Sequence, residues 1–344
     1  MTESVYLGID TSCYTTSLFC MDRQGRAVAE ARRILNVKPG SCGLQQSEML
    51  YQHTRNLPEL METAAEGHDF ILLGIGVSAK PRPREESYMP AFLAGLGFAR
   101  SLAALYHIPL WQISHQENHL EAALWSVQGY EAERFLFLHA SGGTTDLLLA
   151  EKQVAGNYSL KEIGGSLDLH AGQFVDRVGV ALGLGFPAGP ALEKLAEEHT
   201  ELLDIPVSVH KTKVSFSGPC TWVLRAVEKE ARAAGQVASA AVQNDSVTPW
   251  HLHDTWSANL AASVQRGLAE TFVRMVRNGA AEHKVKDVIL AGGVCANRWI
   301  RSYMEAKLAR RGIRVWLPEN RYSGDNAAGC AAYARRQGEL IHHG

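Results

Sequence analysis

The sequence lacks the features of a membrane, secreted or strongly charged protein. No stretch approaches the ~18 apolar residues that cross a bilayer, and the opening MTESVYLGID has neither the basic segment nor the long apolar core of a signal peptide. The formal net charge is only −2 at pH 7, so no overall field attracts nucleic acid and RNA binding would need a local patch or a partner protein. We expect a soluble, cytoplasmic protein with no membrane association.

The chain also lacks paired cysteines and low-complexity segments. Its 6 cysteines are scattered and form no C-x-x-C pair, which excludes an obvious disulfide framework and favours a reducing compartment. The composition is that of an ordinary globular protein, with 46% hydrophobic and 20% charged residues. Because 344 residues exceed what one hydrophobic core usually organises, we expect two domains.

One short pattern occurs twice. HASGGTTDLLL begins at His139, and DTSCYTTSLF begins at Asp10, an offset of 129 residues (139 − 10) at which Ser, Thr, Thr and Leu coincide in register. Each copy follows an apolar run, so each predicts a strand, a turn of small polar residues and a second strand. Because such residues are common in turns, coincidence is one explanation; a duplicated domain is the other.

Other segments alternate between helical and strand patterns. Apolar spacing predicts helices over 47–66, interrupted at Pro58, over 91–106 and over about 256–278,. Phe70–Ala79 and VILAGG read as buried strands,.

Several glycine-rich turns could hold phosphate. Glycines allow backbone N–H groups to converge on an anion, and a helix N-terminus attracts negative charge. Candidates are the Ser-Gly-Gly turn at Ser141, Gly189 ahead of a helix, and GGVCANRWIR from Gly292. Each alone is more typical of a plain tight turn, since none matches a known phosphate-loop fingerprint. Together they favour a nucleotide site.

HQENH places His115 and His119 on one helix face at the i, i+4 spacing that metal chelation uses. This is not the zinc-protease H-E-x-x-H motif, because Glu117 projects to the opposite side. Two histidines on a helix without a metal are the simpler interpretation. A metal needs a third ligand, for which Asp325 and His139 are candidates, and such a set would suit one Zn²⁺ or Fe²⁺.

The ordered motifs resemble the TsaD/Kae-type family, whose members form threonylcarbamoyladenosine in tRNA and were long described as O-sialoglycoprotein endopeptidases. The resemblance rests on HxExH, SGG-T, SLDLHAGQFVD, GFPAGP, VSFSG, GGVCANR and SGDNAA, and it covers about Val5 to Arg336. It implies the duplicated actin/hexokinase/Hsp70-type (ASKHA) α/β fold, with two lobes around a central nucleotide cleft. On this basis we expect an N-terminal lobe over 1–112, a C-terminal lobe over 113–336 and a tail over 337–344.

The resemblance also assigns roles to residues. It implies one divalent metal, held by His115, His119, Asp325 and also His139, and ATP, ADP or an acyl-adenylate as the bound nucleotide. The implied nucleotide contacts are His139, Ala140, Ser141, Gly142, Gly143, Asp176, Gly189, Gly292, Gly293 and Asn297. Asp176 would take a ribose hydroxyl, and the Gly-Gly-x-x-x-Asn junction would pack the adenine. Protein partners and tRNA are the implied partners, and no catalytic residue is identified.

The chain departs from the family pattern at several positions, which favours a divergent paralogue. Neutral residues follow Cys13 where acidic ones are usual, and Lys80–Arg84 replaces a Gly-Pro-Gly loop. This loop is either a solvated, proline-stiffened segment or an arginine clamp on phosphate. Further departures are Asn118 for a usual Gly, Thr144 for His or Asn, and Pro219-Cys220 for Leu-Lys.

Three functions are compatible with these observations. The first is transfer of a threonylcarbamoyl or related carbamoyl group to an adenosine of the tRNA anticodon loop. The second is carbamoyl or acyl transfer to a small molecule, which the altered loop would suit. The third is a non-catalytic ATP-binding regulator in a complex. Protease activity is not expected, because the sequence shows no nucleophile–base pair and no zincin geometry.

Overall fold

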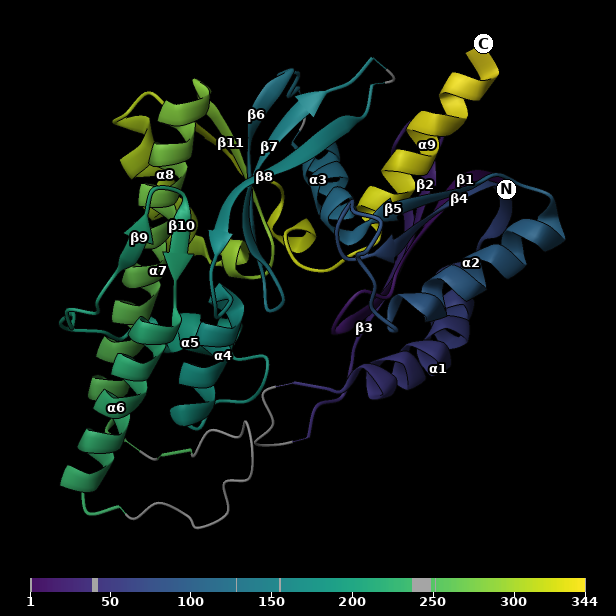
Figure 1. Cartoon of the computed structure of the whole chain (residues 1–344). Coiled ribbons are helices and arrows are strands. Elements are labelled where there is room, and N and C mark those ends of the chain that lie inside the picture. The colour runs from purple at the N-terminus through teal and green to yellow at the C-terminus, as the bar shows by residue number, and fades with distance from the viewer. Residues whose placement is uncertain are drawn as a thin grey trace. The chain divides into compact units, whose positions relative to one another are not determined.

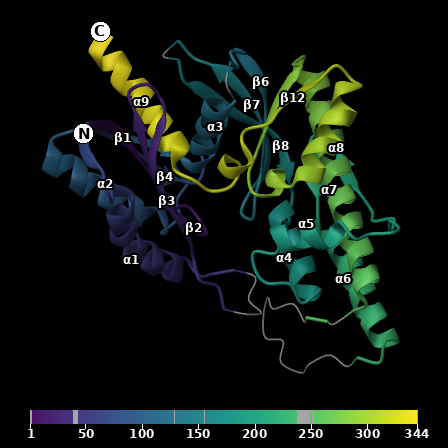
Figure 2. The same cartoon turned by 180° about the vertical axis from the view of Figure 1, so that it is seen from behind.

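The computed structural model describes residues 2–38, 43–127, 129–154, 156–236, 249–250 and 252–343. The chain divides into two compact units. Unit 1 comprises Met1–Asn36, Leu44–Tyr130 and Pro318–Gly344, and unit 2 comprises Val37–Gly43 and Glu131–Leu317. Each unit is built around its own sheet (Figures 1 and 2).

Unit 1 holds a five-stranded sheet in the order β3-β2-β1-β4-β5. Strands β1, β2 and β3 form an antiparallel meander, and β4 and β5 run parallel to β1. The strands are β1 (Thr2–Asp10), β2 (Thr15–Asp22), β3 (Ala27–Ile34), β4 (Asp69–Lys80) and β5 (Leu110–Ser114). The helices are α1 (Gln46–Ala65), α2 (Phe92–Tyr106), α3 (His115–Ser126), the 3₁₀ turn η2 (Asn320–Tyr322) and α9 (Ala328–His343).

Alternation along β2 shows how helices cover both faces of this sheet. Leu18 and Cys20 belong to the core formed with α1 and α2, whereas Phe19 and Met21 pack with residues of α3 and α9, as expected for a strand of period two. Gly8 of β1 lies against the start of α9, because a Cβ there would stand 2.2 Å from the Ala327 carbonyl oxygen. This close approach positions the loop that precedes α9.

Unit 2 holds a seven-stranded sheet in the order β12-β11-β6-β7-β8-β10-β9. Its strands are β6 (Arg134–Ala140), β7 (Thr145–Lys152), β8 (Tyr158–Ser166), β9 (Ser208–His210), β10 (Lys213–Ser215), β11 (Asp287–Ala291) and β12 (Arg314–Trp316). Its helices are α4 (Ala171–Ala181), α5 (Gly189–Ala196), α6 (Ser217–Ala233), α7 (Asp254–His283), the 3₁₀ turn η1 (Val294–Ala296) and α8 (Arg298–Ala309). The core of unit 2 joins β6 and β7 to α4, α6 and α7.

The repeat seen in the sequence is present in the fold. The order β3-β2-β1-β4-β5 corresponds to β8-β7-β6-β11-β12, with the same strand directions. The two hairpins also share one register: Asp10 pairs with Ser17 in the first, and His139 pairs with Asp146 in the second. The offset is 129 residues on both strands (139 − 10 and 146 − 17). The predicted duplication is therefore confirmed.

Two expectations differ from the structure. Helix α1 is not interrupted at Pro58, which lies inside it. Proline has no backbone N–H to donate to the preceding turn, but the helix continues because its buried face, which includes Leu57 and Leu60, packs on the sheet. The unit boundaries also differ from lobes at 1–112 and 113–336, because α3 and α9 pack with the first sheet and with each other.

Among the described residues, no helix combines the length and apolar character needed to span a bilayer.

Candidate metal and nucleotide sites

Helix α3 begins with a capping box that fixes its first turn. The Ser114 hydroxyl accepts from the Glu117 backbone N–H at 3.2 Å, and the Glu117 carboxylate accepts from the Ser114 N–H at 2.7 Å. Glu117 is thus the capping carboxylate of α3, and the cap directly precedes His115,. The sequence alone did not predict this capping role of Glu117.

The two histidines and Asp325 converge within unit 1. The His115 and His119 Nε2 atoms lie 3.1 Å apart, and one Asp325 carboxylate oxygen lies 3.5 Å and 3.4 Å from them respectively. His119 is fully buried and the Asp325 side chain is 17% exposed, so the cluster is covered on the helix side and accessible beside Asp325. The predicted grouping of these three side chains is what the structure shows.

Asp10 is a member of this cluster that the sequence did not identify. It ends β1 and is fully buried, and its carboxylate lies 3.4 Å from His115 Nδ1. The hydroxyls of Ser12 and Ser78 both donate to it. A carboxylate on the far ring nitrogen holds an imidazole's orientation, which is a common arrangement behind metal-binding histidines.

Asn118 connects the two segments that carry these ligands. Its fully buried side chain donates to the Asn326 carbonyl at 2.6 Å and accepts from the Cys330 N–H at 2.8 Å. Asn326 follows Asp325, and Cys330 lies in the first turn of α9. The asparagine that departs from the family pattern therefore ties α3 to the Asp325 loop.

Charge in this cluster is distributed unevenly. Burial opposes protonation, but the nearby Asp10 and Asp325 carboxylates raise the pKa of His115 to about 10. Burial and then the charge on His115 lower the pKa of His119. Burial also opposes ionisation of Asp325, yet its contacts with the two histidines hold its pKa well below the usual range. The positive charge of the cluster therefore lies on His115, whereas the His119 imidazole is neutral.

The three ligand atoms fit a small divalent ion. A tetrahedral zinc site with bonds of about 2.05 Å separates its ligand atoms by about 3.3 Å, and the separations here are 3.1, 3.4 and 3.5 Å. Two imidazoles and one carboxylate suit Zn²⁺ or Fe²⁺. Such a triad leaves further positions for a substrate oxygen.

Unit 2 carries the predicted glycine turns at the carboxyl ends of β6 and β11. Within the first turn, the Ser141 N–H donates to the Thr144 carbonyl at 2.8 Å. Gly292, with φ +98°, lies against the Ala140 backbone, and a Cβ there would stand 2.2 Å from the Ala140 carbonyl oxygen. The two turns are consequently packed side by side, and Gly292 can be nothing larger.

Other glycines of these turns face open space. A Cβ built on Gly142, Gly189 or Gly293 would meet no atom within 4 Å, apart from immediate neighbours. Gly172 of α4, in contrast, donates its N–H to the Ser141 carbonyl at 3.1 Å and so brings the start of α4 to the turn. The backbone at Gly142, Gly189 and Gly293 is thus open to close approach by another group, as a phosphate-binding turn requires,.

Asp176 of α4 joins this group through the start of α5. Its carboxylate accepts from the Ala188 N–H at 2.8 Å, and Ala188 directly precedes Gly189. Burial raises the pKa of Asp176 to about 6, against a lowering by that one hydrogen bond. An incompletely solvated carboxylate is suited to accept a ligand's hydroxyl.

Asn297 caps α8, and its side chain therefore serves the fold directly. Its side-chain oxygen accepts from the Ile300 N–H at 2.9 Å, and its amide donates to Gln265 at 2.7 Å. Glu193 of α5 accepts from the Arg298 N–H at 2.8 Å, which ties α5 to α8. Contact between Asn297 and adenine stays a prediction.

Two other predicted features have definite places. His139 is fully buried near the end of β6 in unit 2, and its roles as a metal ligand and nucleotide contact stay predictions. The Lys80–Arg84 loop follows the carboxyl end of β4 and touches the start of α3, because the Pro81 carbonyl accepts from the Gln116 N–H at 3.2 Å.

Solved structures establish the fold class. HypF of T. kodakarensis aligns with a TM-score of 0.57 at 13% identity, over 99% of this chain and 48% of its own. A ROK family glucokinase from Streptomyces griseus aligns with a TM-score of 0.51 at 13% identity, over 96% of this chain and 99% of its own. With the duplicated sheets, these similarities define an α/β protein of the actin/hexokinase/Hsp70 type.

Sequence relatives define the family within that class. The sequence model of the family described as "TsaD: tRNA N6-adenosine threonylcarbamoyltransferase" matches residues 87–332, beginning just after the Lys80–Arg84 loop. A protein of Prochlorococcus marinus (strain MIT 9301) named tRNA N6-adenosine threonylcarbamoyltransferase is 30% identical over 96% of this chain and 90% of its own. The chain belongs to the TsaD family, a family of transferases.

Proposed function

We propose that this protein transfers a threonylcarbamoyl group to an adenosine of a tRNA anticodon loop, with a bound divalent metal and a nucleotide or acyl-adenylate. The relatives' names supply the reaction. The observation that carries the proposal is the near-equilateral triangle of ligand atoms from His115, His119 and Asp325. A protein that had kept only the fold would have no reason to keep this buried donor set.

The chain's own residues support the metal site in three ways. His115, His119 and Asp325 would hold the ion, and it would supply positive charge to phosphate or carbamoyl oxygens. Asp10 would keep the His115 ring in orientation through Nδ1,. Asn118 would hold the Asp325 loop against α3. His139 is proposed as a further ligand on sequence grounds.

The glycine turns of unit 2 would hold the nucleotide. Amides of the Ser141–Gly143 turn and of Gly292–Gly293 would bind phosphate, and Gly189 would allow close approach at the start of α5,. Asp176 would accept a ribose hydroxyl through the carboxylate oxygen that Ala188 leaves available. Cytoplasmic location and assembly with partner proteins belong to the same proposal.

A small-molecule acceptor is the second candidate. It is favoured by the Lys80–Arg84 loop, which stands beside the first turn of α3 and replaces the loop that the family resemblance predicts. Two arginines at this place could bind an anionic small acceptor. A regulator that binds ATP without turnover is a third candidate.

One reconstitution separates these functions. The purified chain, with the rest of a bacterial threonylcarbamoylation system lacking its own TsaD, is supplied with threonine, bicarbonate, ATP and unmodified tRNA. Mass spectrometry of digested tRNA should detect threonylcarbamoyladenosine with the wild type but not with His119→Ala. Unmodified tRNA together with a carbamoylated small molecule would favour the second candidate, and nucleotide binding without any transfer the third.

A further inference from the structure

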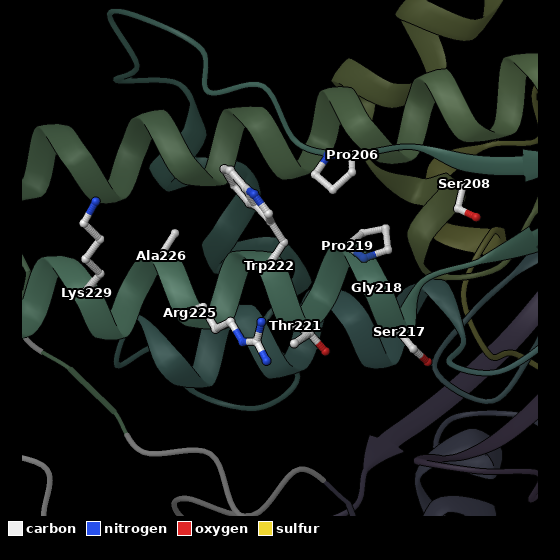
Figure 3. Close-up of a pocket in the computed structure, with 10 residues that line it drawn as sticks. All are labelled: Pro206, Ser208, Ser217, Gly218, Pro219, Thr221, Trp222, Arg225, Ala226 and Lys229. Carbon is white, nitrogen blue, oxygen red and sulfur yellow. The ribbon is translucent and has the colours of Figure 1, made fainter.

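Helix α6 and the segment before β9 line an open pocket that the proposed chemistry does not use (Figure 3). Its volume is about 900 Å³. The lining residues are Pro206, Ser208, Ser217, Gly218, Pro219, Thr221, Trp222, Arg225, Ala226 and Lys229. We call this set the α6 groove.

The groove displays an aromatic ring beside two cations. Trp222, Arg225, Ala226 and Lys229 stand at i, i+3, i+4 and i+7 and so share one helix face,. The Trp222 side chain projects from α6 between Ser217 at one end of the groove and Lys229 at the other (Figure 3), and it is 40% exposed. A partly exposed indole that lines the groove together with Pro206 and Pro219 can serve as a stacking platform,.

The cations of the groove have no acidic partner in the part of the chain that the structure describes. Among the described residues, no acidic side chain lines the groove, and Arg225 and Lys229 form no ion pair. Arg232 of the same helix, in contrast, pairs with Glu228. The groove therefore carries a local positive charge on a chain whose formal net charge is −2.

The length of the groove favours a strand over a single nucleotide. Ser217 and Lys229 are 12 residues apart (229 − 217) on α6, which corresponds to about 18 Å along the helix axis. Stacked nucleotides repeat at about 3.4 Å per strand, so several fit in this length. Stacking on an aromatic ring with flanking cations on phosphates is how proteins bind unpaired RNA.

We propose that the α6 groove binds unpaired nucleotides of the acceptor RNA, with one base stacked on Trp222 and neighbouring phosphates on Arg225 and Lys229. This inference rests on the proposed function, because it takes RNA to be the acceptor. It adds a surface of unit 2 that would bind unpaired nucleotides of the RNA besides the modified adenosine.

Binding of a labelled RNA hairpin with an adenosine-containing loop, measured by fluorescence anisotropy against salt, tests the groove. Trp222→Ala should weaken binding roughly 5- to 150-fold, the range that loss of one stacked base produces, whereas Trp222→Phe should retain most of it. Arg225→Ala with Lys229→Ala should reduce the slope of log affinity against log salt by about 1.4, as expected for two contacts to single-stranded phosphates. A fully paired RNA of equal length should bind more weakly than the hairpin.

Two substitutions outside the groove serve as matched controls. Trp299→Ala removes an indole of similar exposure, 38%, and Arg232→Ala removes a cation from the same helix; both should bind the hairpin like the wild type. The groove assignment is overturned if Trp222→Ala and the double variant also bind like the wild type, or if AMP displaces the hairpin at the concentration at which AMP itself binds.

Activity of the wild type separates this inference from the proposed function. If the wild type modifies tRNA while the groove variants bind RNA normally, the groove assignment alone fails and the function stands. If the wild type neither modifies tRNA nor binds the hairpin, both fail.

Discussion

Asp176 gives a test in which stability and ligand binding change in opposite directions. Burial raises the pKa of this carboxyl group to about 6 in the folded protein, whereas it is about 3.9 in an unfolded chain. Between these two values the folded state binds more protons, so stability falls as the pH rises from about 4 to 6 and stays lower at pH 7. A shift of about 2 units corresponds to no more than about 3 kcal/mol.

Asp176→Asn should therefore stabilise the protein at neutral pH. Asparagine keeps an oxygen that can accept from the Ala188 N–H but carries no charge to desolvate. We expect the free energy of unfolding to rise by about 1 to 3 kcal/mol at pH 7 and to change little at pH 4. Urea unfolding at the two pH values, followed by tryptophan fluorescence, measures the difference.

The same substitution should weaken nucleotide binding. The second carboxylate oxygen becomes an amide that cannot accept a ribose hydroxyl, and loss of a hydrogen bond to a charged group costs about 1.5 to 3 kcal/mol, or roughly 10- to 150-fold in affinity for ADP. In the wild type, ADP affinity should rise as the pH rises through 6, because a hydroxyl donor favours the ionised carboxylate. Calorimetric titration measures both effects.

Asp176→Ala is the matched control, because it removes the charge together with the acceptor of the Ala188 N–H and should gain less stability. The reasoning is refuted if Asp176→Asn shifts stability equally at pH 4 and pH 7, or lowers it at pH 7. ADP affinity equal to that of the wild type would refute only the ribose contact.

The other predictions concern metal, ion pairing and acid stability. His119→Ala should lose the one divalent ion per chain that we expect the wild type and Glu117→Gln to retain, measured by elemental analysis after dialysis. Arg336→Met should lower the free energy of unfolding by about 3 kcal/mol, because it leaves the buried Glu121 carboxylate without its partner. In the wild type, Arg336 contacts this carboxylate at 2.6 and 2.7 Å. Adding Glu121→Leu should recover most of the lost stability, and failure to recover it would contradict this reasoning. Burial opposes ionisation of Asp168, but several hydrogen bonds to its carboxylate lower its pKa to about 2. Asp168→Asn should therefore lower the free energy of unfolding by about 1 kcal/mol at pH 7, after discounting for exposure. This difference in stability should vanish as the pH falls from 4 to 2, and a difference that does not change with pH would show that the charge is not its cause.

The duplicated architecture could be predicted from sequence because its signal is local. Each copy places small polar residues between two apolar strands, and the hairpins pair in the same register, as Asp10 with Ser17 and His139 with Asp146 show. The predicted interruption at Pro58 was wrong because the continuity of helix α1 depends on tertiary packing rather than on local sequence. Local chemistry favours a break there, but the helix is held by packing of its buried face on the sheet, which no local pattern reveals.

The metal site could be predicted only in part. His115 and His119 share a helix face, so their spacing alone indicated proximity. Asp325 was only one of two candidates for the third ligand, beside His139, until the family resemblance supported it, because nothing near it in the sequence indicates which helix it meets. Asp10 was missed although it ends a predicted strand: an aspartate before a Thr-Ser turn is common, and its contact with His115 depends on the packing of α3 on the sheet.

The departures from the family pattern now separate by what each side chain does. Asn118 is a buried connector between α3 and the Asp325 loop, and Cys220 lies in the core of unit 2, so neither can contact an acceptor directly. Pro219, which accompanies Cys220, lines the α6 groove, and Lys80–Arg84 follows the end of β4. Substitutions in a core preserve packing, whereas substitutions on a surface that carries charge change what can bind there. Residues that select a different acceptor, or bind the same acceptor in a different way, are therefore expected in the Lys80–Arg84 loop and the α6 groove rather than among the metal ligands.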